Sequence, residues 1–192
     1  MRLFLAIEIP GEVQRLLADG HASLRAELPK ARWVRSELMH LTLVFLGDTD
    51  PDLVETLARE LTAAVADHAP MQLTVTQAGA FPPRGHARVL WAGLEADGDL
   101  EGLQTAVAGA AERTLGELTD GKQKQRFHAH VTLARCRPPW PRWAVEKLVA
   151  ALARDRPPDP FPVTEVALIE SALRPEGPRY RTVGAYPLGG AG

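Results

Sequence analysis

The feature that most constrains this chain is a short apolar segment with polar alternation that occurs twice. The segments are residues 40–43, His-Leu-Thr-Leu, and, ninety positions later, residues 130–133, His-Val-Thr-Leu. Successive side chains of a strand point to opposite faces, so each histidine shares a face with its threonine while the apolar neighbours point into a core. One copy would be weak evidence, because such tetrapeptides arise by chance. The repeat predicts two equivalent strands that each present a histidine and a threonine.

The rest of the chain alternates between strand-like and helix-like spacing. Strands are expected over residues 2–9, 33–34, 40–46, 71–78, 87–94, 127–134, 163–170 and 180–186. Helices are expected over residues 11–28, from Asp50-Pro51 to about 67, 99–118 and 140–154. We expect a loop over residues 119–126 and an extended linker over residues 157–162. The pattern predicts the α+β class.

No composition shift or long linker divides the sequence. Residues 1–188 are therefore predicted to form a single domain with two similar lobes and a central cleft between them, each lobe carrying one of the repeated segments. The glycine-rich tail, residues 189–192, is expected to be flexible. A duplicated motif that faces itself across a cleft brings two imidazoles to one substrate.

Composition limits the partners and the compartment. The 192 residues carry a net charge of −2, so the chain has no global attraction to nucleic acid or to an anionic membrane. Glu8 and Pro10 interrupt the apolar start, and no stretch approaches the roughly 18 apolar residues of a membrane span. Cys136 is the single cysteine, which excludes an internal disulfide and a cysteine metal cage. We expect a cytoplasmic protein with no membrane partner.

The paired residues suit metal-free acid/base chemistry on a phosphate. Opening a cyclic phosphodiester requires one group to deprotonate water and another to protonate the departing oxygen, and histidine titrates near neutrality. His40 and His130 are the candidates, and the sequence does not decide which one is the acid. The hydroxyls of Thr42 and Thr132 can donate hydrogen bonds to the non-bridging phosphate oxygens.

These segments and their surroundings resemble the 2H phosphoesterase superfamily, and most closely its bacterial and archaeal RNA 2′,3′-cyclic phosphodiesterase branch, also called 2′-5′ RNA ligase. The similarity extends from the first residue to about residue 186, with matching stretches at residues 1–8, 38–47, 79–82, 88–91 and 127–135. Ala129 departs from the family pattern, which usually has proline before the second catalytic histidine.

The resemblance implies a two-lobed fold of two antiparallel sheets, each backed by helices, around a central cleft. It implies hydrolysis of RNA 2′,3′-cyclic phosphate ends to 2′-phosphates, with an ATP-independent 2′-5′ ligation in the reverse sense, and no cofactor. It assigns His40 as proton donor and His130 as proton acceptor, with Thr42 and Thr132 beside them. We expect RNA with cyclic phosphate ends as the partner, and a monomer.

Arg135 closes the second matching stretch, and its guanidinium suits bidentate contact with a phosphate. Strict alternation from His130 directs Arg135 away from the cleft, so this binding role requires a bulge or a strand end. Further basic residues near the second motif and the 79–85 turn are expected to track an RNA backbone: Lys122, Lys124, Arg126, Arg137, Arg142, Arg84 and Arg88. For Lys122 and Lys124, an ordinary solvated loop is the alternative.

Several alternatives stay open. His128 and His130 with His40 could hold zinc, although threonine at the remaining polar position suits phosphate better. Aromatic residues near the motifs are expected to stack a base or, more commonly, to fill the core: Phe45, Phe81, Phe127 and Trp91. Cys136 is expected to be an inert thiol, and the remaining histidines are expected on a helix surface or in a loop: His21, His68 and His86. A non-catalytic RNA-end or nucleotide-binding module, or a phosphodiesterase for another small cyclic phosphate, are the competing functions.

Overall fold

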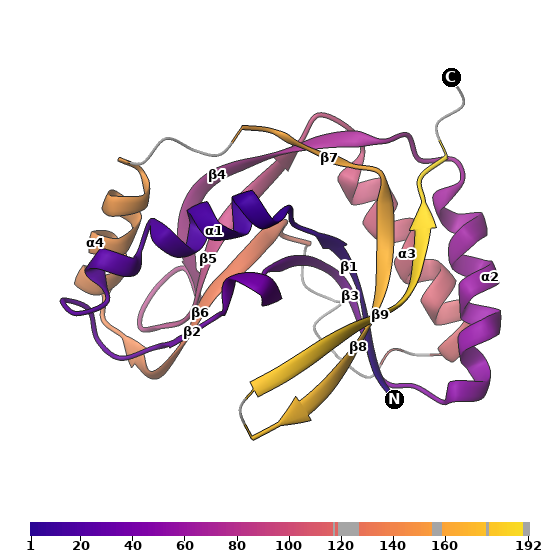
Figure 1. The fold of residues 1–192 in the computed structure, drawn as a ribbon, viewed down its shortest axis with the longest axis horizontal. Helices are drawn as coiled ribbons and strands as arrows, with labels where there is room; N and C mark the ends of the chain where they lie inside the picture. The colour runs from indigo at the N-terminus through magenta and orange to yellow at the C-terminus, as the bar shows by residue number, and fades with distance from the viewer. Residues whose placement is uncertain (117, 119–126, 155–158, 176, 190–192) are drawn as a thin grey trace.

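The computed structural model describes residues 1–116, 118, 127–154, 159–175 and 177–189 (Figure 1). Its strands are β1 (Arg2–Glu8), β2 (Arg32–Trp33), β3 (His40–Asp48), β4 (Met71–Phe81), β5 (Ala87–Ala96), β6 (His130–Trp140), β7 (Phe161–Val163), β8 (Glu165–Arg174) and β9 (Gly177–Pro187). Its α-helices are α1 (Gly11–Asp19), α2 (Val54–Val65), α3 (Leu100–Leu115) and α4 (Arg142–Leu152), with short 3-10 turns at Ala22–Leu24, Ser36–Leu38 and Pro51–Leu53. The predicted α+β class is confirmed. The expected loop at residues 119–126 lies outside the described residues.

The described strands form one curled antiparallel sheet (Figure 1). The strand order is β7-β4-β5-β6-β3-β1-β8-β9, with β2 added beside β6. The two expected sheets are therefore continuous, and they meet where β3 pairs with β6 at Leu41 and Val131. Both of these side chains are fully buried. The repeated segments thus form the junction between the two halves of the fold.

The helices cover the two halves separately. Helices α2 and α3 pack against each other and contact β9 and β3, while α4 contacts β4 and β5 (Figure 1). Helix α2 buries Leu57, Leu61 and Val65, which recur every four residues and so form one stripe. The Asp50 carboxylate accepts a hydrogen bond from the Asp52 backbone N–H at 3.0 Å, as expected for the residue before the proline that opens this segment.

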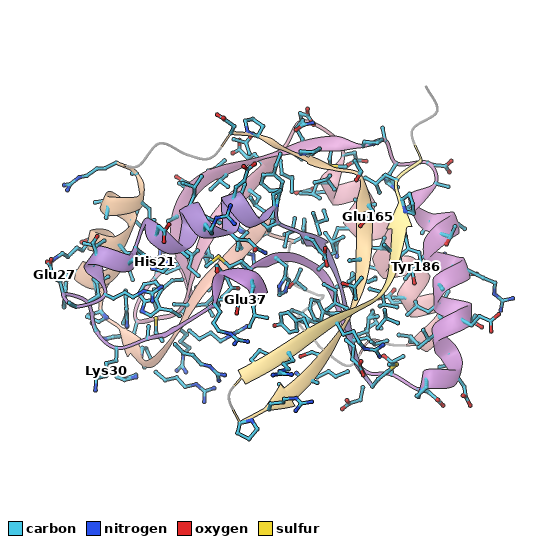
Figure 2. The ribbon with its side chains drawn as sticks, in the orientation of Figure 1. His21, Glu27, Lys30, Glu37, Glu165 and Tyr186 are labelled. Atoms are coloured by element: carbon cyan, nitrogen blue, oxygen red, sulfur yellow. The ribbon has the colours of Figure 1, made fainter. Side chains whose placement is uncertain are left out.

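The first predicted helix is shorter than expected. The helix predicted over residues 11–28 ends at Asp19, and Gly20 leads into the turn at Ala22–Leu24. His21 (Figure 2) lies in a turn, one of its two predicted positions, but it is fully buried. Its ring is stacked on Trp33 at 4.1 Å between centroids. The apolar spacing beyond residue 20 therefore reflects a buried turn.

Strand β6 begins at His130, three residues later than predicted, and continues through Pro138 and Pro139 to Trp140. Its ladder with β5 changes register between the pair at Arg135 and the pair at Trp140. Since proline has no N–H to donate, the two prolines fit where the ladder is interrupted. The strand therefore extends beyond its predicted end at residue 134 and includes both prolines.

The carboxyl-terminal end of the described chain is hydrogen-bonded to helix α2. The Gly189 N–H donates to the Val65 carbonyl at 3.2 Å, and residues 190–192 of the predicted flexible tail lie outside the described residues. Within the described ranges, none of the helices combines the length and hydropathy that crossing a membrane requires.

Candidate active site

The two repeated segments lie side by side at the centre of the sheet. The antiparallel register through Leu41 and Val131 aligns His40 with Thr132 and Thr42 with His130. All four polar side chains are half-buried, whereas the apolar residues between them point into the core. We call the surface that carries these two histidines and two threonines the motif face. It brings together the four residues that the sequence singled out.

Both imidazoles are held in the same way. Nδ1 of His40 lies 2.8 Å from the Leu38 carbonyl oxygen, and Nδ1 of His130 lies 2.6 Å from the His128 carbonyl oxygen. Since a carbonyl can only accept, Nδ1–H donates in each pair and the neutral ring has its lone pair on Nε2. Each ring is thus oriented with Nε2 left to exchange a proton with a substrate.

The surroundings lower the pKa of both rings. Burial is the main cause, and it lowers the pKa of His40 and His130 alike, while the hydrogen bonds to the backbone carbonyls act against it. The positive charge of Arg135 lowers the pKa of both rings, and a charged His130 lowers that of His40. Two rings that oppose each other's charge favour a state with one proton shared between the pair.

A bulge brings Arg135 to the motif face. In the ladder of β5 and β6, Leu90 pairs with Ala134 and Trp91 pairs with Thr132, so Leu133 is the extra residue. The chain consequently buries Leu133 and Ala134 in succession and exposes Arg135. Strict alternation pointed Arg135 the other way, and the bulge that its binding role requires is present.

The first motif carries the same bulge. In the ladder of β1 and β3, Leu5 pairs with Val44 and Ala6 pairs with Thr42, which makes Leu43 the extra residue. Phe45 is exposed as a result, at the position that corresponds to Arg135 five residues after its histidine. The two halves therefore match in backbone and differ in what they present, an aromatic ring in one and a guanidinium in the other.

Aromatic rings flank each histidine. The His40 ring lies 4.9 Å from Phe4 and 5.4 Å from Tyr180, measured between centroids. The His130 ring lies 5.2 Å from Phe81 and 6.3 Å from Trp91. These rings remove the imidazoles from water, which explains the dominant effect of burial on their pKa values.

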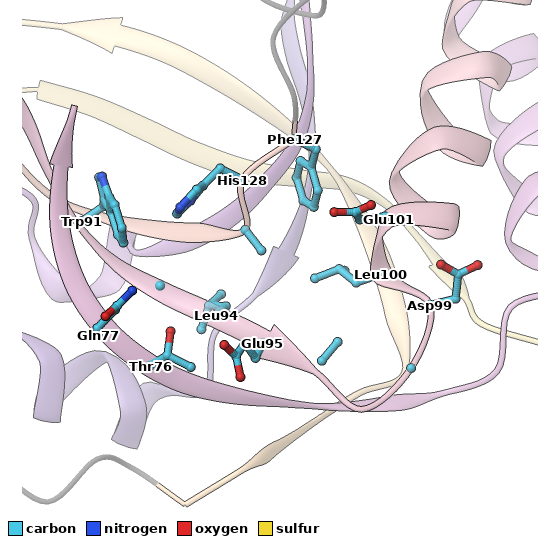
Figure 3. Close-up of a pocket in the computed structure, with 14 residues that line it drawn as sticks. Thr76, Gln77, Trp91, Leu94, Glu95, Asp99, Leu100, Glu101, Phe127 and His128 are labelled. Carbon is cyan, nitrogen blue, oxygen red and sulfur yellow. The ribbon is translucent and has the colours of Figure 1, made fainter. Parts of the chain in front are cut away.

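A cavity of about 620 Å³ opens beside the second motif (Figure 3). Trp91, Phe127 and His128 line one part of it, and Glu95, Asp99 and Glu101 contribute carboxylates. The His128 ring lies 5.8 Å from the His130 ring, so the cavity adjoins the motif face. Its acidic groups make this cavity unsuited to a phosphate.

The remaining predicted site residues divide into several groups. Lys122, Lys124 and Arg126 lie outside the described residues. Arg142 forms an exposed ion pair with Glu146 at 2.6 Å. Cys136 is buried and its pKa is raised to about 11, which keeps the thiol neutral as expected. Within the described ranges, no three or more histidine, cysteine, aspartate or glutamate side chains are grouped to hold a metal.

Sequence reasoning missed three charged neighbours of the site. Arg32 pairs directly with Arg135 across β2 and β6, which puts both on one face. Arg35 Nη2 donates to the Pro178 carbonyl at 3.4 Å, which ties the β8 and β9 hairpin to the segment after β2. Glu8 pairs directly with His40 across β1 and β3. A two-residue strand and a cross-strand register leave little signal in the sequence.

Comparisons with known proteins agree with this arrangement. Residues 10–174 match the profile of the family described as the 2′-5′ RNA ligase superfamily. The chain is 35% identical over 199 residues to an RNA 2′,3′-cyclic phosphodiesterase of Thermus thermophilus, covering 99% of this chain and 91% of the relative. It is 30% identical to proteins of that name from Thermotoga maritima, of which it covers 93%, and Geobacillus stearothermophilus, of which it covers 57%.

Solved structures show the same fold. The crystal structure of TT0787 from Thermus thermophilus superimposes with a TM-score of 0.81 at 29% sequence identity, with full coverage of both chains. The apo form of LigT from E. coli superimposes with a TM-score of 0.72 at 24% identity over 98% of each chain. The profile match covers most of the sequence, and the two strands that carry the repeated motif meet at the centre of a sheet shared with these structures. The chain therefore belongs to the 2′-5′ RNA ligase superfamily.

Proposed function

We propose that the protein is an RNA 2′,3′-cyclic phosphodiesterase that opens terminal cyclic phosphates to 2′-phosphates without a metal or another cofactor. The observation that carries this proposal is the pairing of the two motifs across β3 and β6. It supplies two imidazoles from separate halves of the fold, each with Nδ1 bonded to a carbonyl and Nε2 left for proton transfer. The names of the relatives support the same substrate.

In the proposed reaction, neutral His130 accepts a proton from water at Nε2 while the water oxygen attacks phosphorus. The bond from phosphorus to the 3′ oxygen breaks, and protonated His40 donates its Nε2 proton to that oxygen. The product keeps the phosphate on the 2′ oxygen and carries a free 3′ hydroxyl. When an RNA 5′ hydroxyl takes the place of water, its proton passes to His130, its oxygen bonds to phosphorus and the 3′ oxygen leaves with the proton from His40, which gives a 2′-5′ linkage without ATP.

The other residues of the motif face stabilise charge on the phosphate. We assign the hydroxyls of Thr42 and Thr132 to the non-bridging oxygens, where negative charge accumulates in the transition state. The Arg135 guanidinium is assigned to binding the phosphate, because the bulge at Leu133 exposes it and its charge reaches both histidines. Exposed Phe45 offers a surface on which a base can stack.

A set of arginines suggests where the rest of the RNA lies. We call Arg32, Arg35 and Arg174 the basic rim. Arg32 adjoins Arg135, and a Cβ added to Gly177, the β-pair partner of Arg174, would lie 3.4 Å from the Arg32 guanidinium. This rim extends the positive charge of Arg135 toward the β8 and β9 hairpin, which supports an RNA substrate whose backbone continues past the cyclic phosphate.

The direct test is incubation with an RNA that ends in a 2′,3′-cyclic phosphate, in EDTA and without nucleotide. We expect a product phosphorylated only at the 2′ oxygen, identified by its resistance to a 3′-specific phosphatase. His40→Ala and His130→Ala should each abolish turnover while the circular dichroism spectrum and melting temperature stay near those of the wild type. Replacement of exposed His86 by Ala is the matched control and should leave turnover unchanged.

Three outcomes contradict the proposal. Full activity in either catalytic variant removes the two-histidine mechanism. Activity lost in EDTA and restored by zinc favours the alternative in which histidines bind a metal. Tight binding of the cyclic end with no turnover by the wild type favours the non-catalytic module.

We further propose that residues 1–188 act as one domain, that the protein is a monomer and that it works in the cytoplasm. The continuous sheet supports the single domain, because its two halves share the β3 and β6 pairing. The single cysteine agrees with a reducing compartment. Sedimentation equilibrium tests the monomer, and a mass of two chains at micromolar concentration would contradict it.

A further inference from the structure

The two histidines differ in the residue that faces each of them across the strand. On β1, the direct partner of His40 is Glu8. On β5, the direct partner of His130 is Gly93. The backbones of the two ladders match here, with the same bulge after each threonine and the same carbonyl bond to each Nδ1. A carboxylate therefore lies beside the His40 ring, whereas the corresponding residue beside the His130 ring is a glycine and has no side chain.

Glu8 is held on the motif face. Direct partners in an antiparallel ladder point to the same side, and in β1 the side chains of Phe4 and Ala6 share that side with Glu8. The Glu8 carboxylate accepts a hydrogen bond from the Thr182 hydroxyl at 3.0 Å. Strand β8 separates β1 from β9, so this bond crosses a strand and restrains the carboxylate beside His40.

The packing around Gly93 disfavours a matching carboxylate. A Cβ at this position would lie 2.6 Å from the Thr76 hydroxyl oxygen and 3.1 Å from the Gln77 carbonyl oxygen. A side chain there requires the Thr76 hydroxyl to turn away and the Gln77 carbonyl to shift by a few tenths of an ångström. The packing of β4 against β5 therefore favours glycine at the position that faces His130.

The charged and titratable groups around His40 come from three strands. His130 and Arg135 on β6 and Tyr180 on β9 flank the ring, and Glu8 on β1 is the one that raises the pKa of His40. His130 faces His128 and Arg135, which both lower its pKa. Glu165 shares a small cavity of about 140 Å³ with Glu8, one strand further from His40 (Figure 2).

We propose that Glu8 is the positioning residue that makes the two histidines unequal. Its carboxylate favours the protonated ring of His40 and so makes His40 the donor to the leaving 3′ oxygen, while His130, which has no such partner, stays neutral and accepts the proton from water. This inference rests on the proposed function for its meaning in catalysis. The effect of the Glu8 carboxylate on the protonation of His40 is present in the free protein and can be measured without turnover.

The first test is an NMR titration of the histidine rings in the wild type, Glu8→Gln and the matched control Glu165→Gln. In Glu8→Gln we expect the titration midpoint of His40 to fall by about half a pH unit or more, since an adjacent carboxylate stabilises the imidazolium. The midpoint of His130 should move less, and Glu165→Gln should leave both near the wild-type values. Thr182→Val, which frees the carboxylate, should shift His40 in the same direction by a smaller amount.

The second test is the pH dependence of turnover. If His40 is the acid, a half-unit fall in its midpoint costs about threefold in kcat/KM at the alkaline end of the profile and nothing at the acidic end. A residue that only supported the fold would reduce the rate at every pH.

The two hypotheses fail in different ways. An unchanged His40 midpoint in Glu8→Gln, or an equal shift of His130, overturns the role of Glu8 whatever the activity. A wild type that does not open the cyclic phosphate overturns the proposed function, while the NMR titration still decides whether Glu8 distinguishes the two rings.

Discussion

Thr42 and Thr132 are aligned with the opposite histidines and are half-buried on the motif face. If their hydroxyls donate to the phosphate oxygens, their contribution grows as charge accumulates in the transition state. We predict that Thr42→Val and Thr132→Val each lower kcat by about 10- to 100-fold, with smaller effects on KM. Steady-state kinetics on an RNA with a cyclic phosphate end provide the measurement.

Valine keeps the β-branched shape of threonine and lacks only the hydroxyl, so the strand pairing of β3 and β6 should persist in these variants. Thr62→Val on the exposed face of α2 is the matched control and should leave kcat unchanged. If KM rises tenfold at constant kcat, the hydroxyls bind the ground state and the transition-state role is wrong.

Arg135 acts on both rings through its charge. Its guanidinium lowers the pKa of His40 and of His130, so its removal should raise both. In Arg135→Gln we therefore expect both limbs of the pH profile to move to higher pH, opposite to the shift expected for Glu8→Gln, together with weaker phosphate binding. Profiles of kcat/KM from pH 4 to pH 9 test this. A drop in rate with both limbs unmoved would show that Arg135 lies too far from the rings to affect them.

Single residues of the site differ in how well the sequence predicts them. The two histidines and two threonines were found because their spacing repeats and alternation alone fixes their face. Arg135 was found by resemblance, while alternation pointed it the wrong way, because the bulge at Leu133 depends on how β6 pairs with β5. Glu8 was missed because its place beside His40 exists only in the register of β1 and β3.

At the scale of elements, the segment between α1 and β2 contains a buried titratable group. His21 is fully buried against Trp33, and burial is the main cause that lowers its pKa from 6.5 to about 4. Because the ring in the unfolded chain binds a proton at higher pH than the folded one, protonation favours unfolding as the pH falls from about 6.5 to about 4. The protein should lose about 2 kcal/mol of stability from this residue between pH 7 and pH 5.

His21→Phe should keep the ring stacked on Trp33 and remove the titration. We expect the free energy of unfolding of this variant, from urea melts at pH 7 and pH 5, to depend less on pH than that of the wild type by about this amount. His86→Gln in the exposed turn between β4 and β5 is the control, and should show the wild-type dependence. An identical pH dependence in His21→Phe would mean that the pKa of His21 is the same in the folded and unfolded states.

Most elements follow from periodicity, and the exceptions have a common origin. The strands β1 and β3 and the helices α2 and α3 lie close to their predicted ranges, because their apolar residues keep one period over their length. The helix predicted to continue to residue 28 stops at Asp19, since apolar spacing does not distinguish a helix from a buried turn. Strand β6 continues through Pro138 and Pro139 because its ladder with β5 is interrupted there, so no backbone N–H is needed from either proline. Only the tertiary pairing of the strands decides where this interruption lies.

At the scale of the whole molecule, two contacts among the described residues link the halves around the site. The first is the β3 and β6 pairing, which sets the histidines side by side. The second is the bond from Arg35 to Pro178, which ties the β8 and β9 hairpin of one half to the segment after β2 in the other. The same hairpin supplies Tyr180 to the His40 ring, so the position of the hairpin and the environment of His40 are coupled.

The basic rim leads to a prediction about substrate length. If Arg32 and Arg174 contact the RNA backbone, Arg32→Ala and Arg174→Ala should raise KM for an oligonucleotide with a cyclic end and leave KM for a mononucleotide 2′,3′-cyclic phosphate unchanged. Each lost phosphate contact should also reduce the slope of log KM against log salt by about 0.7. Arg59→Ala on exposed α2 is the control and should leave both substrates and the slope unaffected. Equal effects on both substrates would instead place these arginines at the cyclic phosphate itself, and no effect on either would remove the rim from the RNA path.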